Sequence, residues 1–277
     1  RTRLACTAVV ALMACLTILE LYRLAVDLGA DPKMSLRWMG VLLFSPAFLL
    51  YTSDTFKDGP VAFFVTVTLT SGLRLARQFS MWRIACGLLS LLALWYVRFY
   101  LVFLTTLPLV VGLAGLRARS ALRPALVALG LTGVFLAVAA FTGVFDLVAE
   151  QAGGTFAQGT NPFVLAANAG QGSGVTFDDG GSPWGGLALK LLYTVLSPFP
   201  WQSGSFGFHV GKLDVAIWYY ALYRSFKAGK RLWRDDRTTL MMFITFLVPM
   251  AVMYATSFSN IGLNLRQRVR VGCAGKV

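Results

Sequence analysis

Two carboxylates and an amine lie close together where one apolar block of the sequence ends and the next begins. Asp54, Lys57 and Asp58 fall within five residues of one another. A carboxylate there could take the proton from an attacking hydroxyl or bind sugar hydroxyls, and the lysine could meet an anionic head group. A structural interpretation is equally open, in which Asp54 caps the following helix and pairs with Lys57. The segment therefore suggests acid–base chemistry without specifying it.

Three arginines are candidates for binding a phosphate. Arg98 stands between two apolar blocks where the chain must reverse, and Arg266 and Arg268 follow the last apolar block. The planar guanidinium can bind a phosphate through two parallel hydrogen bonds. Alternatively, Arg98 extends to the membrane interface, and the Arg-Gln-Arg run flanks a further helix. Arg266 and Arg268 point to different sides of an extended or helical chain, so they share one phosphate only if the chain turns.

The segment 146–186 is the longest stretch without an apolar block, and it is rich in glycine. Trp184 could stack on a sugar ring, and Asp178 and Asp179 could bind sugar hydroxyls or a divalent cation. A solvated loop without a site would have the same composition. His209 is the single histidine, and the four cysteines form no CxxC pair. We therefore expect no transition-metal site, and no cofactor is firmly indicated.

The elements that position these residues are expected to be membrane helices. Apolar residues make up 57% of the 277-residue chain and charged residues only 13%, and the mean hydropathy is +0.67. Soluble domains carry about a quarter charged residues, so this chain has too few charges to coat a soluble exterior. The net charge of +13 is spread over short loops rather than over one basic face. A nucleic-acid partner is therefore not expected.

The fold class predicted from these blocks is all-α, a polytopic bundle with about eight spans in a single transmembrane domain, residues 1–277. The stretch 187–200 contains Lys190 and ends in Ser-Pro-Phe-Pro-Trp, so we expect an interfacial or re-entrant helix there. The chain begins at Arg1 and is expected to be a piece of a longer protein. The expected spans are 4–21, 38–52, 60–75, 84–97, 101–115, 124–145, 213–226 and 238–257.

Lysine and arginine gather in alternate loops, which the positive-inside rule assigns to the cytoplasm. These basic loops are 22–37, 74–83, 116–123 and 227–237. The candidate residues described above then all fall on the opposite, extracytoplasmic face, including the loop 146–186. Lys57, Arg98, Arg266 and Arg268 break the positive-inside pattern there, and such charges require a partner or a function.

Several short motifs together resemble a known class of bacterial envelope proteins. They are Ser45-Pro46 leading to Ser-Asp-Thr-Phe-Lys-Asp, the block ending Arg-Phe-Tyr, the Ser-Pro-Phe-Pro-Trp stretch, and Asn-Ile-Gly-Leu-Asn-Leu-Arg-Gln-Arg. In these motifs the chain is similar to polyprenol-phosphate-dependent glycosyltransferases with a GT-C type fold and to polysaccharide polymerases. The resemblance covers most of residues 38–268.

The resemblance implies sugar transfer from a polyprenyl-phosphate-linked donor to a glycan or lipid acceptor during envelope polysaccharide synthesis. The reaction would take place at the outer face of the plasma membrane, with membrane lipids around the protein. GT-C enzymes place a catalytic acid in an early outer loop, and only Asp54 or Asp58 could fill that place here. Two alternatives remain open: a transporter or flippase component that carries lipid-linked glycan, and a non-catalytic membrane subunit of a glycan-assembly complex.

Overall fold

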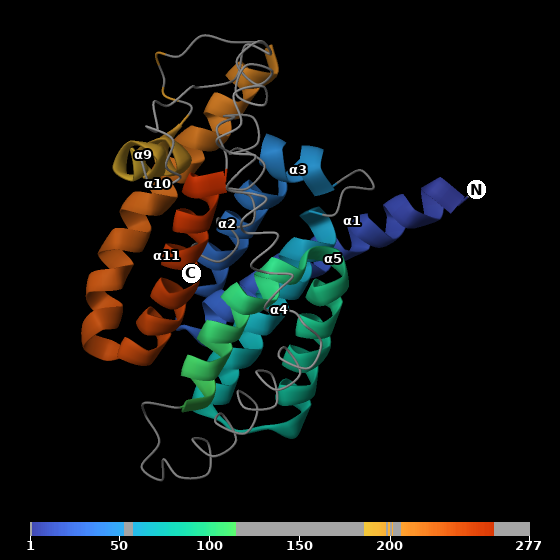
Figure 1. Ribbon diagram of the computed structural model, residues 1–277, viewed down its shortest axis with the longest axis vertical. Helices are drawn as coiled ribbons and strands as arrows, with labels where there is room; N and C mark the ends of the chain where they lie inside the picture. The colour runs from blue at the N-terminus through green and yellow to red at the C-terminus, as the bar shows by residue number, and fades with distance from the viewer. Residues whose placement is uncertain are drawn as a thin grey trace.

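The computed structural model describes residues 2–52, 58–114, 186–197, 199, 201 and 206–257, and within these ranges the chain forms helices and no strand (Figure 1). The helices are α1 (Thr2–Asp27), α2 (Pro32–Leu43), α3 (Pro46–Thr52), α4 (Asp58–Arg77), α5 (Met81–Ala114), α9 (Leu187–Leu196), α10 (Phe206–Asp235) and α11 (Arg237–Ser257).

Four helical segments in the described part of the chain are long and apolar enough to cross a membrane. Three of them carry exposed large apolar side chains, as expected of helices that face lipid, whereas the segment that begins at Asp58 is mostly buried. The prediction of a helical membrane protein is therefore supported, whereas the number of eight spans stays a prediction. The predicted span 124–145 and the loop 146–186 lie outside the described residues, apart from Gly186. The four segments are Leu4–Asp27, Asp58–Arg77, Met81–Arg98 and Arg237–Ala255.

The chain reverses within α5, as the sequence predicts. Arg98 has an extended backbone (φ −155°, ψ 87°) between two helical halves. A Cβ at Gly87 would lie 3.5 Å from Cδ1 of Leu109. In one straight helix these two residues would be about 33 Å apart, so the halves must fold back on each other, as Figure 1 shows.

The main core lies between α4, both halves of α5, and α11. The contact between α4 and the second half of α5 is especially close, because a Cβ at Gly112 would lie only 2.4 Å from the carbonyl oxygen of Gly72. Only glycine fits at this crossing. The buried core side chains include Val61, Val65, Leu94, Leu101, Phe246 and Met250.

The single span predicted at 38–52 is wrong, because two short helices, α2 and α3, occupy this region. Pro46 disfavours helical backbone at the residue before it. Ser45, which lies at the break, is buried and donates a 2.5 Å hydrogen bond from Oγ to Asp214 Oδ1 of α10. The helix break therefore coincides with a polar contact to α10, and the apolar composition of this stretch gives no sign of it.

The short helix α9 has ten residues. That length spans about 15 Å, half of a bilayer core, which agrees with the prediction of a helix that does not cross. Its last carbonyls have partners on α10: Trp218 Nε1 donates to Val195 O at 2.7 Å, and the Tyr219 hydroxyl donates to Leu196 O at 2.5 Å. These side chains satisfy carbonyl groups that every helix end leaves unpaired.

Candidate functional site

Two pairs of contacts fix the relative direction of α1 and α4. Near one end, a Cβ at Gly59 would lie 2.8 Å from Cγ1 of Val10. Near the other end, Arg74 Nε lies 2.7 Å from Asp27 Oδ2. Residue numbers rise in the same direction along both helices, so α1 and α4 are parallel. The start of α4 and the charged end at Arg74 therefore lie at opposite ends of the bundle.

The candidate site lies at the start of α4, where Arg98 meets Asp58. Arg98 Nη2 lies 3.5 Å from Asp58 Oδ1, and the two side chains are 20% and 0% exposed. Asp58, predicted as a catalytic acid, and Arg98, predicted to bind phosphate, are thus brought together across 40 positions of the chain. The roles predicted for these two residues stay predictions.

Tyr100 completes the cluster, and the sequence analysis did not include it as a site residue. Arg98 Nη1 donates a 2.6 Å hydrogen bond to the Tyr100 hydroxyl oxygen. The signal that could have found it is the Arg-Phe-Tyr spacing at a helix reversal. The extended backbone of Arg98 places it between the two halves of α5, and Tyr100 opens the second half.

Local structure favours an acid at position 58. Asp58 is the first residue of α4, where free backbone N–H groups and the helix dipole stabilise a negative charge. Gly59, the next residue, lets this turn approach α1 closely, because any side chain would meet Val10. The acid is therefore held in a fixed and enclosed position.

The two charged side chains of the pair differ in what they can reach. The Asp58 side chain is fully enclosed, whereas one fifth of the Arg98 side chain is exposed. A guanidinium has five N–H donors, so contacts with Asp58 and Tyr100 leave it with capacity for an anion. The geometry suits Arg98 as the group that meets a ligand and Asp58 as the group that holds Arg98 in place.

The contact between Ser45 and Asp214 belongs to the same half of the bundle. The seven-residue helix α3 leads from Ser45 to Thr52, and the Cα of Thr52 lies 3.9 Å from the position of a Cβ on Gly59. Ser45 belongs to one of the motifs that carry the resemblance, whereas Asp214 was not predicted as a site residue. The sequence signal for this contact is the Ser-Pro pair inside an apolar block.

At the opposite end of the bundle, ion pairs and a hydrogen bond join the helices. Arg74 lies 3.5 Å from Glu20 and 2.7 Å from Asp27 of α1. Arg77 lies 3.7 Å from Asp236, just before α11. Arg83, in the first turn of α5, donates a 2.9 Å hydrogen bond to the Arg74 carbonyl. Apart from Glu20, these residues come from the loops that the positive-inside rule assigns to the cytoplasm, so the described basic loops meet at one end.

The remaining predicted site residues lie outside the described residues. In the part of the chain that the structure describes, no three histidine, cysteine or acidic side chains are grouped so as to hold a metal ion. A divalent cation bound by the loop acids stays a prediction. The predicted residues concerned are Asp54, Lys57, Asp178, Asp179, Trp184, Arg266 and Arg268.

Comparison of the chain with protein-family models, with curated proteins and with solved structures found no match in any of the three.

Proposed function

We propose that this protein is a membrane glycosyltransferase or polymerase that uses polyprenyl-phosphate-linked sugars at the outer face of the plasma membrane. The observation that carries the proposal is the Arg98–Asp58 pair. A partly exposed arginine, braced by an enclosed carboxylate, sits at the end of the helices opposite the basic loops. Charge at this end of a membrane bundle is costly, and binding an anionic substrate gives it a purpose.

In the proposed reaction an acceptor hydroxyl oxygen attacks the anomeric carbon of the donor sugar. The bond between that carbon and the phosphate oxygen breaks, and the electron pair leaves with the polyprenyl phosphate. Arg98 binds the departing phosphate and stabilises the charge that develops on it. Asp54 accepts the proton of the acceptor hydroxyl, whereas Asp58 keeps the guanidinium oriented.

Other predicted residues extend this proposal. Lys57, Arg266 and Arg268 would add positive charge for the diphosphate or phosphate group of the donor. Trp184, Asp178 and Asp179 would bind the sugar through stacking and hydrogen bonds. The polyprenyl chain would lie along the exposed apolar side chains of the spanning helices.

The test is sugar transfer in vesicles that contain the purified protein, with polyprenyl-phosphate-linked sugar as donor. Arg98→Lys keeps the charge but removes the planar fork, so product formation should fall about 100-fold, as when one oxyanion donor is lost. Arg74→Lys is the matched control, because Arg74 also pairs with an aspartate but at the opposite end. The control should retain the rate of the unsubstituted protein.

The proposed base can be tested in the same assay: Asp54→Asn should lower the rate of sugar transfer by about 10²–10⁴-fold.

Two outcomes would count against the proposal. Equal rates for Arg98→Lys and the unsubstituted protein would contradict the phosphate-binding role of Arg98. Transport of lipid-linked sugar across the vesicle membrane without any transfer product would favour a carrier over an enzyme.

A further inference from the structure

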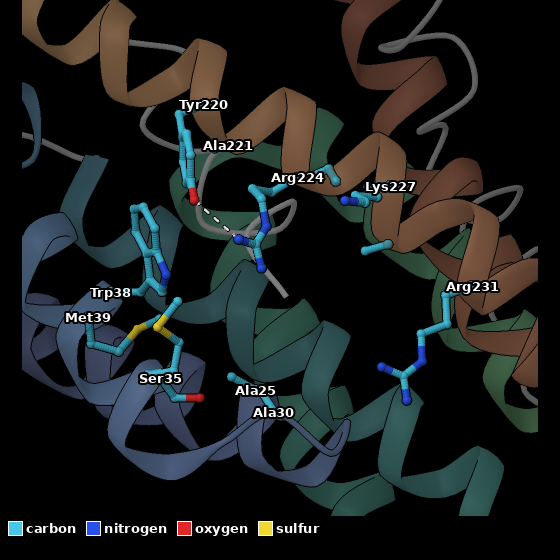
Figure 2. A pocket seen from close by; sticks show the side chains of 13 residues that line it. Ala25, Ala30, Ser35, Trp38, Met39, Tyr220, Ala221, Arg224, Lys227 and Arg231 are labelled. Carbon is cyan, nitrogen blue, oxygen red and sulfur yellow. Dashed lines mark hydrogen bonds between the residues drawn. The ribbon is translucent and has the colours of Figure 1, made fainter.

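A second candidate site lies at the basic end of the bundle, away from Arg98. A cavity of about 340 Å³ opens between α10 and the region where α1 leads into α2 (Figure 2). One of its lining residues, Ala25, is 15 positions beyond Val10, the residue that packs against the start of α4. That separation along α1 is about 22 Å. The cavity is therefore distinct from the Arg98–Asp58 site.

Three cationic side chains of α10 line this cavity. Figure 2 shows Arg224 and Arg231 extending from α10 toward the space above Ala25 and Ser35. Arg224 Nη1 lies 3.1 Å from the Tyr220 hydroxyl, and Arg231 Nε lies 3.3 Å from Asp235 Oδ2 in a largely exposed pair. Lys227 forms no ion pair within the described ranges. The positive charge on this face thus exceeds the negative charge that meets it.

A buried hydroxyl on the opposite wall lacks a partner. Ser35 is 4% exposed, and its Oγ has no hydrogen-bond partner in the part of the chain that the structure describes. A buried polar group without a partner destabilises a fold by about 1–3 kcal/mol, so this hydroxyl is available to donate a hydrogen bond to a ligand in the cavity. Ser35 and the three cations line the same cavity.

Apolar side chains form the rest of the wall and continue beyond it. The rings of Trp38 and Tyr220 stack with centroids 5.1 Å apart, and Met34 and Met39 also line the cavity. Elsewhere on α2 and at its C-cap, Leu36, Val41 and Phe44 are exposed as well. A ligand that fits this surface has an anionic group for the cations and a hydrocarbon part for α2.

From these observations we infer that the cavity binds the phosphate group of an anionic phospholipid in the cytoplasmic leaflet. The cations contact the phosphate oxygens, the Ser35 hydroxyl donates to one of them, and an acyl chain lies along α2. Basic pockets between helices at the cytoplasmic surface suit such head groups. A soluble phosphate compound would use the cations but leave the apolar surface of α2 uncovered.

The experiment measures quenching of Trp38 fluorescence in phosphatidylcholine vesicles that contain brominated phosphatidylglycerol. The Trp38 signal is the difference between the protein and its Trp38→Phe variant. Half-maximal quenching should occur at about tenfold lower mole fraction of brominated phosphatidylglycerol than of brominated phosphatidylcholine. Equal quenching by the two lipids would overturn the inference.

A matched pair of variants separates the cavity from general surface charge. Arg224→Gln with Lys227→Gln removes two lining cations, and this preference should vanish. Lys230→Gln with Arg234→Gln removes two cations of the same helix that do not line the cavity, so the preference should persist. Equal loss in both variants, or reversal of quenching by millimolar glycerol 3-phosphate, would contradict a lipid site.

Ser35→Ala gives an independent result that does not depend on the charged variants. In phosphatidylcholine alone the variant should unfold no more easily than the unsubstituted protein, because it removes a hydroxyl without a partner. With phosphatidylglycerol present, its lipid preference should fall about threefold. A loss of stability in phosphatidylcholine, or an unchanged preference, would contradict the assigned role of this hydroxyl.

Discussion

The two ends of the helical bundle are both charged, but they hold their charges in different ways. At the basic end Arg74 and Asp27 are 28% and 40% exposed, and the same arginine also reaches Glu20. At the other end Arg98 meets Asp58, whose side chain is 0% exposed. In the first arrangement one arginine is shared by two partly exposed acids, whereas in the second the acid is fully enclosed.

This difference shows which charges the fold can lose without large effects. Exposed pairs contribute little to stability, because water and salt screen them and long side chains lose freedom in forming them. An enclosed pair is costly to assemble, and it is far more costly to leave half of it behind. We therefore interpret the charges at the basic end as setting membrane orientation and connecting helices, and the Arg98–Asp58 pair as a candidate ligand-binding site.

The largest difference in stability between the two ends should appear when one arginine is removed at each end. Arg98→Ala should lower the free energy of unfolding by about 3 kcal/mol, because it removes the guanidinium that lies 3.5 Å from the enclosed Asp58 carboxylate. Arg74→Ala should lower it by less than about 1 kcal/mol, since its pair with Asp27 is partly exposed and Glu20 keeps Arg23 as a partner. Reversible unfolding in mixed micelles with sodium dodecyl sulfate measures both values.

A double variant sharpens this first comparison. Asp58→Asn combined with Arg98→Ala should recover part of the lost stability, because the enclosed side chain at position 58 is then neutral and no longer depends on the Arg98 charge. Equal destabilisation by Arg98→Ala and Arg74→Ala would contradict the distinction between the ends. This cost to the fold is also why Arg98→Lys, rather than Arg98→Ala, is the better test of activity.

A smaller effect is expected at the break between α2 and α3. Ser45→Ala should lower the free energy of unfolding by about 2 kcal/mol, because the hydroxyl donates to the Asp214 carboxylate. Ser90→Ala is the control, since Ser90 is similarly buried but has no hydrogen bond to a carboxylate in the described part of the chain. A difference below about 0.5 kcal/mol between the variants would show that the contact does not stabilise the break.

Much of the helical pattern was predictable from the sequence, because apolar blocks and polar punctuation determine where membrane helices form. The reversal at Arg98 followed from a charged residue between two blocks of about 15 residues each, too short for one crossing apiece without local adjustment. The break at Ser45 was not predictable from composition. Its stabilising contact comes from Asp214, which is 169 positions away in the chain.

The candidate site was predictable in part. An acid near 58 and the arginine at 98 were expected on one face from the alternation of basic loops. Their direct contact, and the hydrogen bond to Tyr100, depend on how α4 and the two halves of α5 pack around glycine crossings. The Ser35 cavity was not predicted, because no local pattern distinguishes a buried hydroxyl with a partner from one without.

The most direct test of the account is which side of the membrane each end faces. In a protein with its four native cysteines replaced by serine, Lys57→Cys and Gln78→Cys each introduce one thiol, next to Asp58 and within the basic end. A membrane-impermeant maleimide applied to intact cells should label position 57 at once and position 78 only after the cells are permeabilised. Labelling of both positions from outside, or of position 78 alone, would contradict an outward-facing Arg98–Asp58 site.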